Sequence, residues 1–204
     1  MEFLFLIIIL IFSVIIHEIS HGAMADYLGD PTARLAGRLT LNPLKHLDPI
    51  GSFLVPLFLI LMNSPILFAW AKPVPINTRN FRDQRYGSAK VALAGPLANF
   101  GIALFFGLLI RFIPKISLIP GLYFMFSYIV FLNILLAVFN LLPIPPLDGS
   151  HILFAILPNS FKNVRIIFNR LGLFVLLFVL FALSDWLMVF IDLIFKAITA
   201  NSFL

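Results

Sequence analysis

This 204-residue sequence contains no cysteine, which excludes disulfides and thiolate metal sites. Charged residues are also scarce, at 11% of the chain, whereas 61% of the residues are hydrophobic and the mean hydropathy is +1.07. This composition is typical of an integral membrane protein and excludes an ordinary soluble domain. The net charge of +5 does not indicate nucleic-acid binding, because the basic residues lie in loops between apolar segments, where they determine membrane topology.

Five apolar segments follow one another along the chain, at residues 3–27, 50–69, 88–112, 118–142 and 166–197. A membrane-spanning helix needs about 20 residues, so the first, third, fourth and fifth segments are predicted to cross. The second is weak because Pro56 and residues 63–65 interrupt it. We therefore predict an all-α membrane protein, a polytopic helical bundle with about four full spans and one re-entrant segment. Apolar and polar residues partly alternate at 32–41, which predicts a short β element at the membrane surface. Residues 74–77 are predicted to form another.

The first segment ends in the motif HEISH at residues 17–21, in a chain that has only four histidines and two glutamates. Positions i and i+4 share a helix face, so His17 and His21 can bind one metal ion. Glu18 lies one residue round the helix, within reach of a water on that metal without being a ligand. Ionisable groups in a membrane helix cost several kcal/mol unless they are paired, and zinc is the expected partner. The alternative is two hydrogen-bonded histidines in a helical bundle.

A cleaved signal peptide is a second interpretation of the N-terminus, because Ala23-Met24-Ala25 resembles a cleavage site. Residue 2, however, is Glu rather than a basic residue. The HEISH motif would also occupy the region immediately before the cut.

We expect a single integral-membrane domain over residues 1–204, because the chain is too short for a second soluble domain and contains no linker that suggests one.

A catalytic zinc site takes three protein ligands and a water, so a third ligand is needed. Asp148 is the best candidate, because it follows three prolines that should stop the fourth segment and leave non-helical backbone at membrane depth. Asp148 could instead simply cap the helix that follows it. The rival ligands are His151, His46 and Asp48.

These motifs, taken in order, resemble the site-2 protease family of intramembrane zinc metalloproteases. The resemblance covers about residues 5–155 and is closest to the compact prokaryotic branch. It rests on HEISH at 17–21, LNP at 41–43, FAWAKPVP at 68–75, AGPLAN at 94–99 and NLLPIPPLDG at 140–149.

The resemblance implies that His17, His21 and Asp148 bind one Zn²⁺ and that Glu18 is the catalytic base. It also suggests Asn140 near the site, where its side chain would stabilise the oxyanion or position the substrate. Alternatively, the side chain of Asn140 only hydrogen-bonds to backbone groups that the helix break leaves unpaired. The chain departs from the family in two ways: no PDZ-like domain is inserted between the motifs, and His151 stands where a basic residue is more usual.

The zinc ligands also constrain the topology. If all five segments crossed the membrane, the first and fourth helices would be antiparallel, and HEISH and Asp148 would lie near opposite faces. With a re-entrant second segment the two helices are parallel. The basic residues then divide eleven to three, with Arg111, Lys115 and Lys196 on the side away from the motifs. By the positive-inside rule the site opens toward the cytoplasm and the N-terminus lies outside the cell membrane.

The expected activity is hydrolysis of peptide bonds in or near transmembrane segments. The expected partners are the lipid bilayer and, as substrate, a single-pass membrane protein or a signal-peptide remnant, which must unwind locally before attack. The stretches 33–41 and 72–77 could pair with the unwound substrate by adding a strand. Two other functions are a non-catalytic zinc-binding membrane scaffold or chaperone, which would not need Glu18, and a transporter, which should show an internal repeat.

Overall fold

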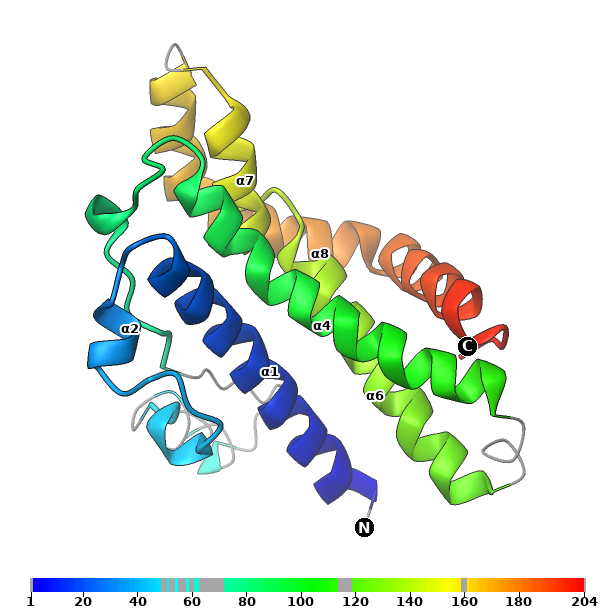
Figure 1. Ribbon diagram of the computed structural model, residues 1–204. Coiled ribbons are helices and arrows are strands. Elements are labelled where there is room, and N and C mark those ends of the chain that lie inside the picture. Colours follow the sequence, from blue (N-terminus) through cyan, green and yellow to red (C-terminus); the bar gives the residue numbers. More distant parts are fainter. Residues whose placement is uncertain are drawn as a thin grey trace.

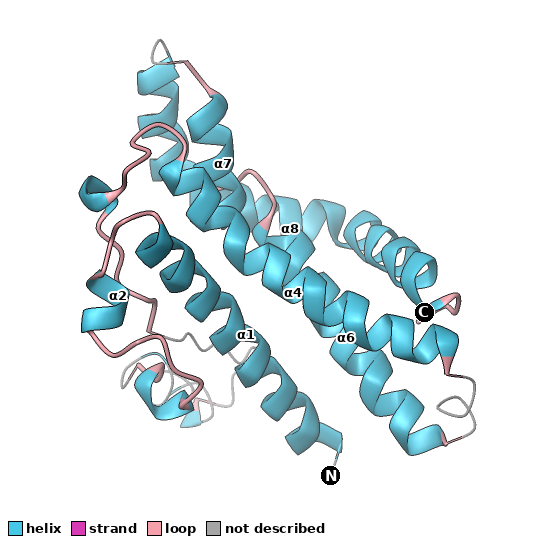
Figure 2. Ribbon diagram, viewed as in Figure 1, coloured by secondary structure: helices cyan, strands magenta, loops and turns pink. Residues whose placement is uncertain are grey.

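The computed structural model describes residues 2–48, 51, 54, 58, 61, 62, 72–113, 119–158 and 161–203. These residues form helices and loops without a sheet (Figure 2). Within them, four helices are long and apolar enough to cross a membrane: α1 (Glu2–Tyr27), α4 (Gly87–Phe112), α6 (Pro120–Asn140) and α8 (Lys162–Thr199). They coincide with the first, third, fourth and fifth predicted segments. The prediction of an all-α membrane bundle is confirmed.

The shorter elements lie between these helices (Figure 1). Three of them follow α1, and one, α7, connects α6 to α8. They are α2 (Thr32–Leu35), η1 (Pro43–Lys45), η3 (Thr78–Asn80) and α7 (Asp148–Ile156).

The strand predicted at 32–41 is wrong, because Thr32–Leu35 form helix α2. Pro31 precedes this helix with a φ of −77°, which already suits a helical start. Gly37 follows it with a φ of 62°, the left-handed conformation that commonly terminates helices. Alternation over so few residues does not distinguish a strand from a single helical turn. Residues 72–77 lie outside any helix or sheet.

The long connection from α1 to α4 leaves and returns at the same end of the bundle. The backbone N–H of Arg82 donates to the carbonyl of Leu28 at 2.8 Å, and that of Lys72 donates to His46 at 2.9 Å. As a result, α1 and α6 run in the same direction, with α4 antiparallel between them (Figure 1). The predicted parallel arrangement is therefore present. The re-entrant segment itself, 50–69, lies almost entirely outside the described residues.

Helix α4 is the centre of the bundle and contacts α1, α6, α7 and α8. Because lipid is as apolar as a protein core, membrane helices associate through close packing, which small residues permit. Gly107 illustrates this, since a Cβ there would lie 2.4 Å from Cγ2 of Ile198 in α8. The buried core between α4, α6 and α8 consists of Ala103, Ile110, Val130, Ile134, Ile191, Phe195 and Ile198.

A buried carboxylate fastens the loop between α1 and α4. Asp30 is fully buried and accepts hydrogen bonds from the backbone N–H of Asn77 at 2.6 Å and the side-chain amide of Asn80 at 2.8 Å. It also accepts from Thr32. Burial alone would raise the pKa of Asp30, but these hydrogen bonds outweigh it and hold the pKa below its usual value. Asp30 thus joins the end of α1 to residues 77–80.

Replacing Asp30 by Ala should loosen this loop. The change leaves the Asn77 N–H and the Asn80 amide without their acceptor, and losing a hydrogen bond to a charged group costs about 1.5–3 kcal/mol. We expect limited trypsin digestion at the loop arginines to become about tenfold faster or more in detergent. The control is Asp26→Ala, which removes only a 3.4 Å pair with the exposed Arg34. Equal digestion rates for the two variants would contradict the role given to Asp30.

Candidate metal centre and active site

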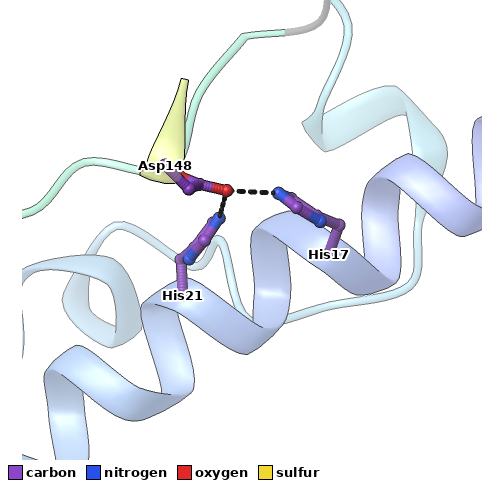
Figure 3. A group of neighbouring side chains, drawn as sticks. All are labelled: His17, His21 and Asp148. Carbon is purple, nitrogen blue, oxygen red and sulfur yellow. Dashed lines mark hydrogen bonds and ion pairs between the residues drawn. The ribbon is translucent and has the colours of Figure 1, made fainter. Parts of the chain in front are cut away.

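Three side chains from distant parts of the chain converge near the C-terminal end of α1. His17 and His21 lie one turn apart on α1, and Asp148 is the first residue of α7 (Figure 3). The Nε2 atoms of His17 and His21 lie 3.0 Å and 3.3 Å from Oδ2 of Asp148. One ligand atom from each residue falls within 4.8 Å of the others. The structure therefore brings together the three predicted zinc ligands.

The loop after α6 places Asp148. Helix α6 ends at Asn140, and the proline-rich stretch that follows leads into α7. Gly149 lies so close to this loop that a Cβ would be 2.2 Å from the carbonyl oxygen of Leu141. Only glycine allows this approach, which sets α7 directly against the end of α6.

The second ring nitrogen of each histidine is fixed by a buried hydrogen bond. Nδ1 of His21 lies 2.7 Å from the carbonyl oxygen of Val91, which can only accept, so this nitrogen carries the proton. Nδ1 of His17 donates to Oδ1 of Asn99 at 2.6 Å. Both Nε2 lone pairs are therefore left for a metal. Such outer hydrogen bonds orient metal-binding histidines and raise their basicity.

Asn99 belongs to a polar network inside the apolar bundle. Its Nδ2 donates to the carbonyl of Ser13 at 3.2 Å and to Oδ1 of Asn133 at 2.8 Å. Nδ2 of Asn133 donates in turn to Oγ of Ser13 at 3.0 Å. Sequence reasoning did not identify Ser13 or Asn133 as members of this network. The available signal was Asn133 itself, a polar residue in an otherwise apolar span.

Gly95 of α4 packs directly against the metal-binding atoms. A Cβ at this position would lie 2.5 Å from Nε2 of His21 and 2.6 Å from Nε2 of His17. The absence of a side chain here keeps open the space in front of both imidazoles. Gly95 is therefore a close-packing residue that borders the candidate metal centre.

Glu18 lies in the same cavity but outside the ligand group. Its Oε2 accepts a hydrogen bond from the backbone N–H of Val74 at 2.9 Å. The cavity has a volume of about 450 Å³. Its polar and ionisable lining consists of His17, Glu18, His21, Thr78, Ser88, Asn140, Asp148 and His151.

The remaining predicted candidates lie in different places. The Nδ2 of Asn140 donates to the carbonyl of Leu136 at 2.9 Å, and the residue also lines the cavity. His151 lines the cavity and is exposed, but does not belong to the ligand group found among the described residues. His46 is buried, with Nε2 2.8 Å from the carbonyl of Thr40, and Asp48 accepts from the N–H of Gly51 at 2.7 Å. Of the four candidate third ligands, Asp148 alone joins the two histidines.

The environment of Asp148 favours its ionised form. Its Oδ2 atom faces the Nε2 atoms of both histidines, which favours the carboxylate over the neutral acid. A carboxylate and two neutral imidazoles are a ligand set that suits zinc.

Known proteins resemble this chain over most of its length. The family model described as Peptidase family M50 matches residues 113–182. The Bacillus subtilis protein named "Putative zinc metalloprotease YwhC" is 40% identical over 164 residues, which cover 78% of this chain and 71% of that protein. The chain belongs to peptidase family M50. The predicted resemblance to site-2 proteases is thereby confirmed, and the family supports a multi-pass membrane metalloprotease that uses zinc.

Other relatives align over shorter regions. "Putative zinc metalloprotease Rip2" of Mycolicibacterium smegmatis is 33% identical over 140 residues, or 67% of this chain and 51% of that protein. "Putative zinc metalloprotease MJ0611" of Methanocaldococcus jannaschii is 42% identical over 66 residues, or 32% of this chain and 33% of that protein. No solved structure matches the chain.

The residues of this M50 chain fit the zinc that the family implies. His17, His21 and Asp148 supply two imidazole nitrogens and a carboxylate oxygen, all within reach of one ion. The protons on Nδ1 leave both Nε2 atoms as ligands, and Gly95 leaves the space in front of them open.

Replacing Gly95 by Ala should reduce zinc binding, because the new methyl group would collide with both Nε2 atoms. We expect the purified variant to contain well under half of the wild-type zinc per chain, measured by elemental analysis at equal protein concentration. The matched control is Gly101→Ala in the same helix, where a Cβ meets nothing within 4 Å. Wild-type zinc content in Gly95→Ala would show that Gly95 does not border the metal.

Proposed function

We propose that this chain is an intramembrane zinc metalloendopeptidase that hydrolyses peptide bonds in or near transmembrane segments of membrane proteins. The observation that carries the proposal is the position of Glu18. It shares a cavity with the two histidines and Asp148, yet is held by a backbone N–H rather than by the ligand group. Zinc binding alone would not need a carboxylate there.

The roles of the side chains follow from this geometry. Bound zinc supplies Lewis acidity, which makes water acidic enough to be deprotonated near neutral pH and polarises a carbonyl. His17, His21 and Asp148 hold the metal. Oε2 of Glu18 stays bonded to the Val74 N–H, and Oε1 takes the proton of the attacking water and later gives it to the leaving amine nitrogen. Asn140, on the wall of the cavity, positions the substrate or stabilises the oxyanion.

The substrate should be an unwound segment of a membrane helix, because the carbonyl of a helical peptide bond is engaged in the backbone hydrogen-bond ladder. Since Thr32–Leu35 form a turn of helix, residues 72–77, which lie outside any helix, are the better candidate to pair with it. Pro73, Val74 and Ile76 line the cavity. Pro73 and Pro75 have no N–H and Val74 uses its own on Glu18, so substrate pairing would use the Ile76 N–H and nearby carbonyls.

The same proposal includes an orientation in the cell membrane, with the site toward the cytoplasm and the N-terminus outside. Its support is the excess of basic residues on the side of the zinc ligands. They are Arg34, Arg38, Lys45, Lys72, Arg79, Arg82, Arg85, Lys90, Lys162, Arg165 and Arg170. The substrates would then be single-pass membrane proteins or signal-peptide remnants cut near their cytoplasmic ends.

Replacing Glu18 by Gln should abolish catalysis while preserving the metal. The amide oxygen can still accept from Val74, whereas a lost general base typically costs about 10²–10⁴ in rate. The measurement is cleavage of a panel of tagged single-span helices by purified protein at equal zinc content. The control is Glu2→Gln, which changes the other glutamate of the sequence. Equal product from Glu18→Gln and wild type would refute the assigned base, whereas zinc binding without any cleavage would favour a scaffold or chaperone.

Single-cysteine labelling tests the orientation, because the chain has no cysteine of its own. Leu35→Cys and Phe112→Cys place exposed thiols at opposite ends of the bundle, where the native residues are 79% and 71% exposed. With a membrane-impermeant maleimide on intact cells, we expect labelling at 112 and protection at 35 until the membrane is permeabilised. The reverse pattern would place the zinc ligands toward the outside.

A further inference from the structure

Asp185 is an acidic residue on the outer surface of α8, the helix least covered by the bundle. Its side chain is exposed and has no hydrogen bond or ion pair among the described residues. The residues about three, two and one helical turns before it, on the same side, are Phe174 at 70%, Phe178 at 71% and Phe181 at 85% exposure. Asp185 thus lies within an apolar stripe, which continues with the exposed Val189 one turn later.

The depth of Asp185 follows from contacts at the two ends of α8. Gly172 packs against the carbonyl of Pro145, in the loop that leads to the zinc ligand Asp148. At the other end, the guanidinium of Arg111, in the last turn of α4, donates to the carbonyl of Ala197 at 2.8 Å. Asp185 lies near the middle of the stretch between these two contacts.

A second observation gives the same depth. Leu183 and Trp186, on either side of Asp185, line an apolar cavity together with Phe100. Phe100 lies at the centre of α4, which spans Gly87–Phe112. Asp185 is therefore near the middle of the membrane and faces away from its own bundle.

A carboxyl group in this position needs a hydrogen-bond partner, because lipid tails offer none and a charge at the centre of a bilayer costs several kcal/mol. The described residues of this chain do not supply one. The exposed positions Ile167, Leu171, Phe174, Phe178, Phe181 and Asp185 follow one another in steps of four and three residues. This is the spacing with which one helix packs along another, and a single polar residue in such a seam sets the register.

We propose that this stripe of α8 packs against the same stripe of a second copy of the chain, with the two Asp185 carboxyl groups hydrogen-bonded to each other. In a two-fold pair with its axis along the membrane normal, every residue meets its own copy at the same depth. A pair of carboxyl groups that retains a proton has both a donor and an acceptor. The interface is therefore self-complementary. It lies apart from the zinc ligands and does not depend on the proposed peptidase activity.

Cysteine cross-linking in vesicles tests the geometry of this pair. The purified full chain is reconstituted at low protein density as Phe181→Cys, and the matched control is Phe105→Cys on α4, whose native side chain is 60% exposed. We expect the disulfide-linked dimer to form at least about tenfold faster at position 181. Equal rates at the two positions would overturn the proposal, because the purified protein has only its own copies as partners.

The role of Asp185 is tested by adding Asp185→Leu or Asp185→Asn to Phe181→Cys. Asn retains a donor and an acceptor, so rapid cross-linking should persist. Leu should lower the association constant about tenfold, measured by energy transfer between labelled copies on dilution in lipid, and reduce cross-linking toward the control rate. An unchanged association constant in Asp185→Leu would overturn the proposal. Zinc content equal to wild type shows that the Leu variant is folded.

Discussion

The structure depends on one constraint, that His17, His21 and Asp148, up to 131 residues apart in the sequence, bring their possible ligand atoms within 4.8 Å of one another. His17 and His21 lie toward the end of α1, and Asp148 follows the end of α6. They can meet only if these helices are parallel. The connection from α1 to α4 must therefore return to the end where it began, and the hydrogen bonds from Arg82 to Leu28 and from Lys72 to His46 show that it does. The parallel arrangement of α1 and α6 is thus what brings the three side chains of the candidate metal centre together.

Helix α4 organises that centre although it supplies none of the three ligands. Val91, Gly95 and Asn99 are spaced four residues apart and so share one face of the helix. The Val91 carbonyl fixes His21, the Asn99 amide fixes His17, and Gly95 between them leaves the space beside both Nε2 atoms open. Because α4 is antiparallel to α1, the later residue on one helix meets the earlier residue on the other. A single helix face thus sets the tautomer, the orientation and the access of both imidazoles.

The parts that could be predicted from sequence are those with a local pattern or a global constraint. HEISH places two histidines on one helix face, apolar length gives the four spans, and the common metal requires parallel helices. The strand at 32–41 was wrong because one turn of helix, between Pro31 and Gly37, has the same short alternation. Asn133 stood out as a polar residue in an apolar span, but its pairing with Ser13, and the contact of the Val91 carbonyl with His21, could not be predicted. Both contacts depend on how α1, α4 and α6 rotate against one another. Every residue also has a backbone carbonyl, so the residue type gives no sign of which carbonyl will accept from a histidine.

The loop before α4 links the position of Glu18 to a buried carboxylate far from the metal. Val74 donates its N–H to Glu18, and the prolines on either side of it have none to offer. Three residues later, the N–H of Asn77 donates to Asp30, which is anchored at the end of α1. Since α1 also carries Glu18, both ends of this short stretch are held by one helix. Asp30 therefore limits how far Val74 can move relative to Glu18. A substrate that paired with residues 72–77 would be fixed relative to the proposed base by the same contacts, because the wall of the cavity and the orientation of Glu18 share one piece of backbone.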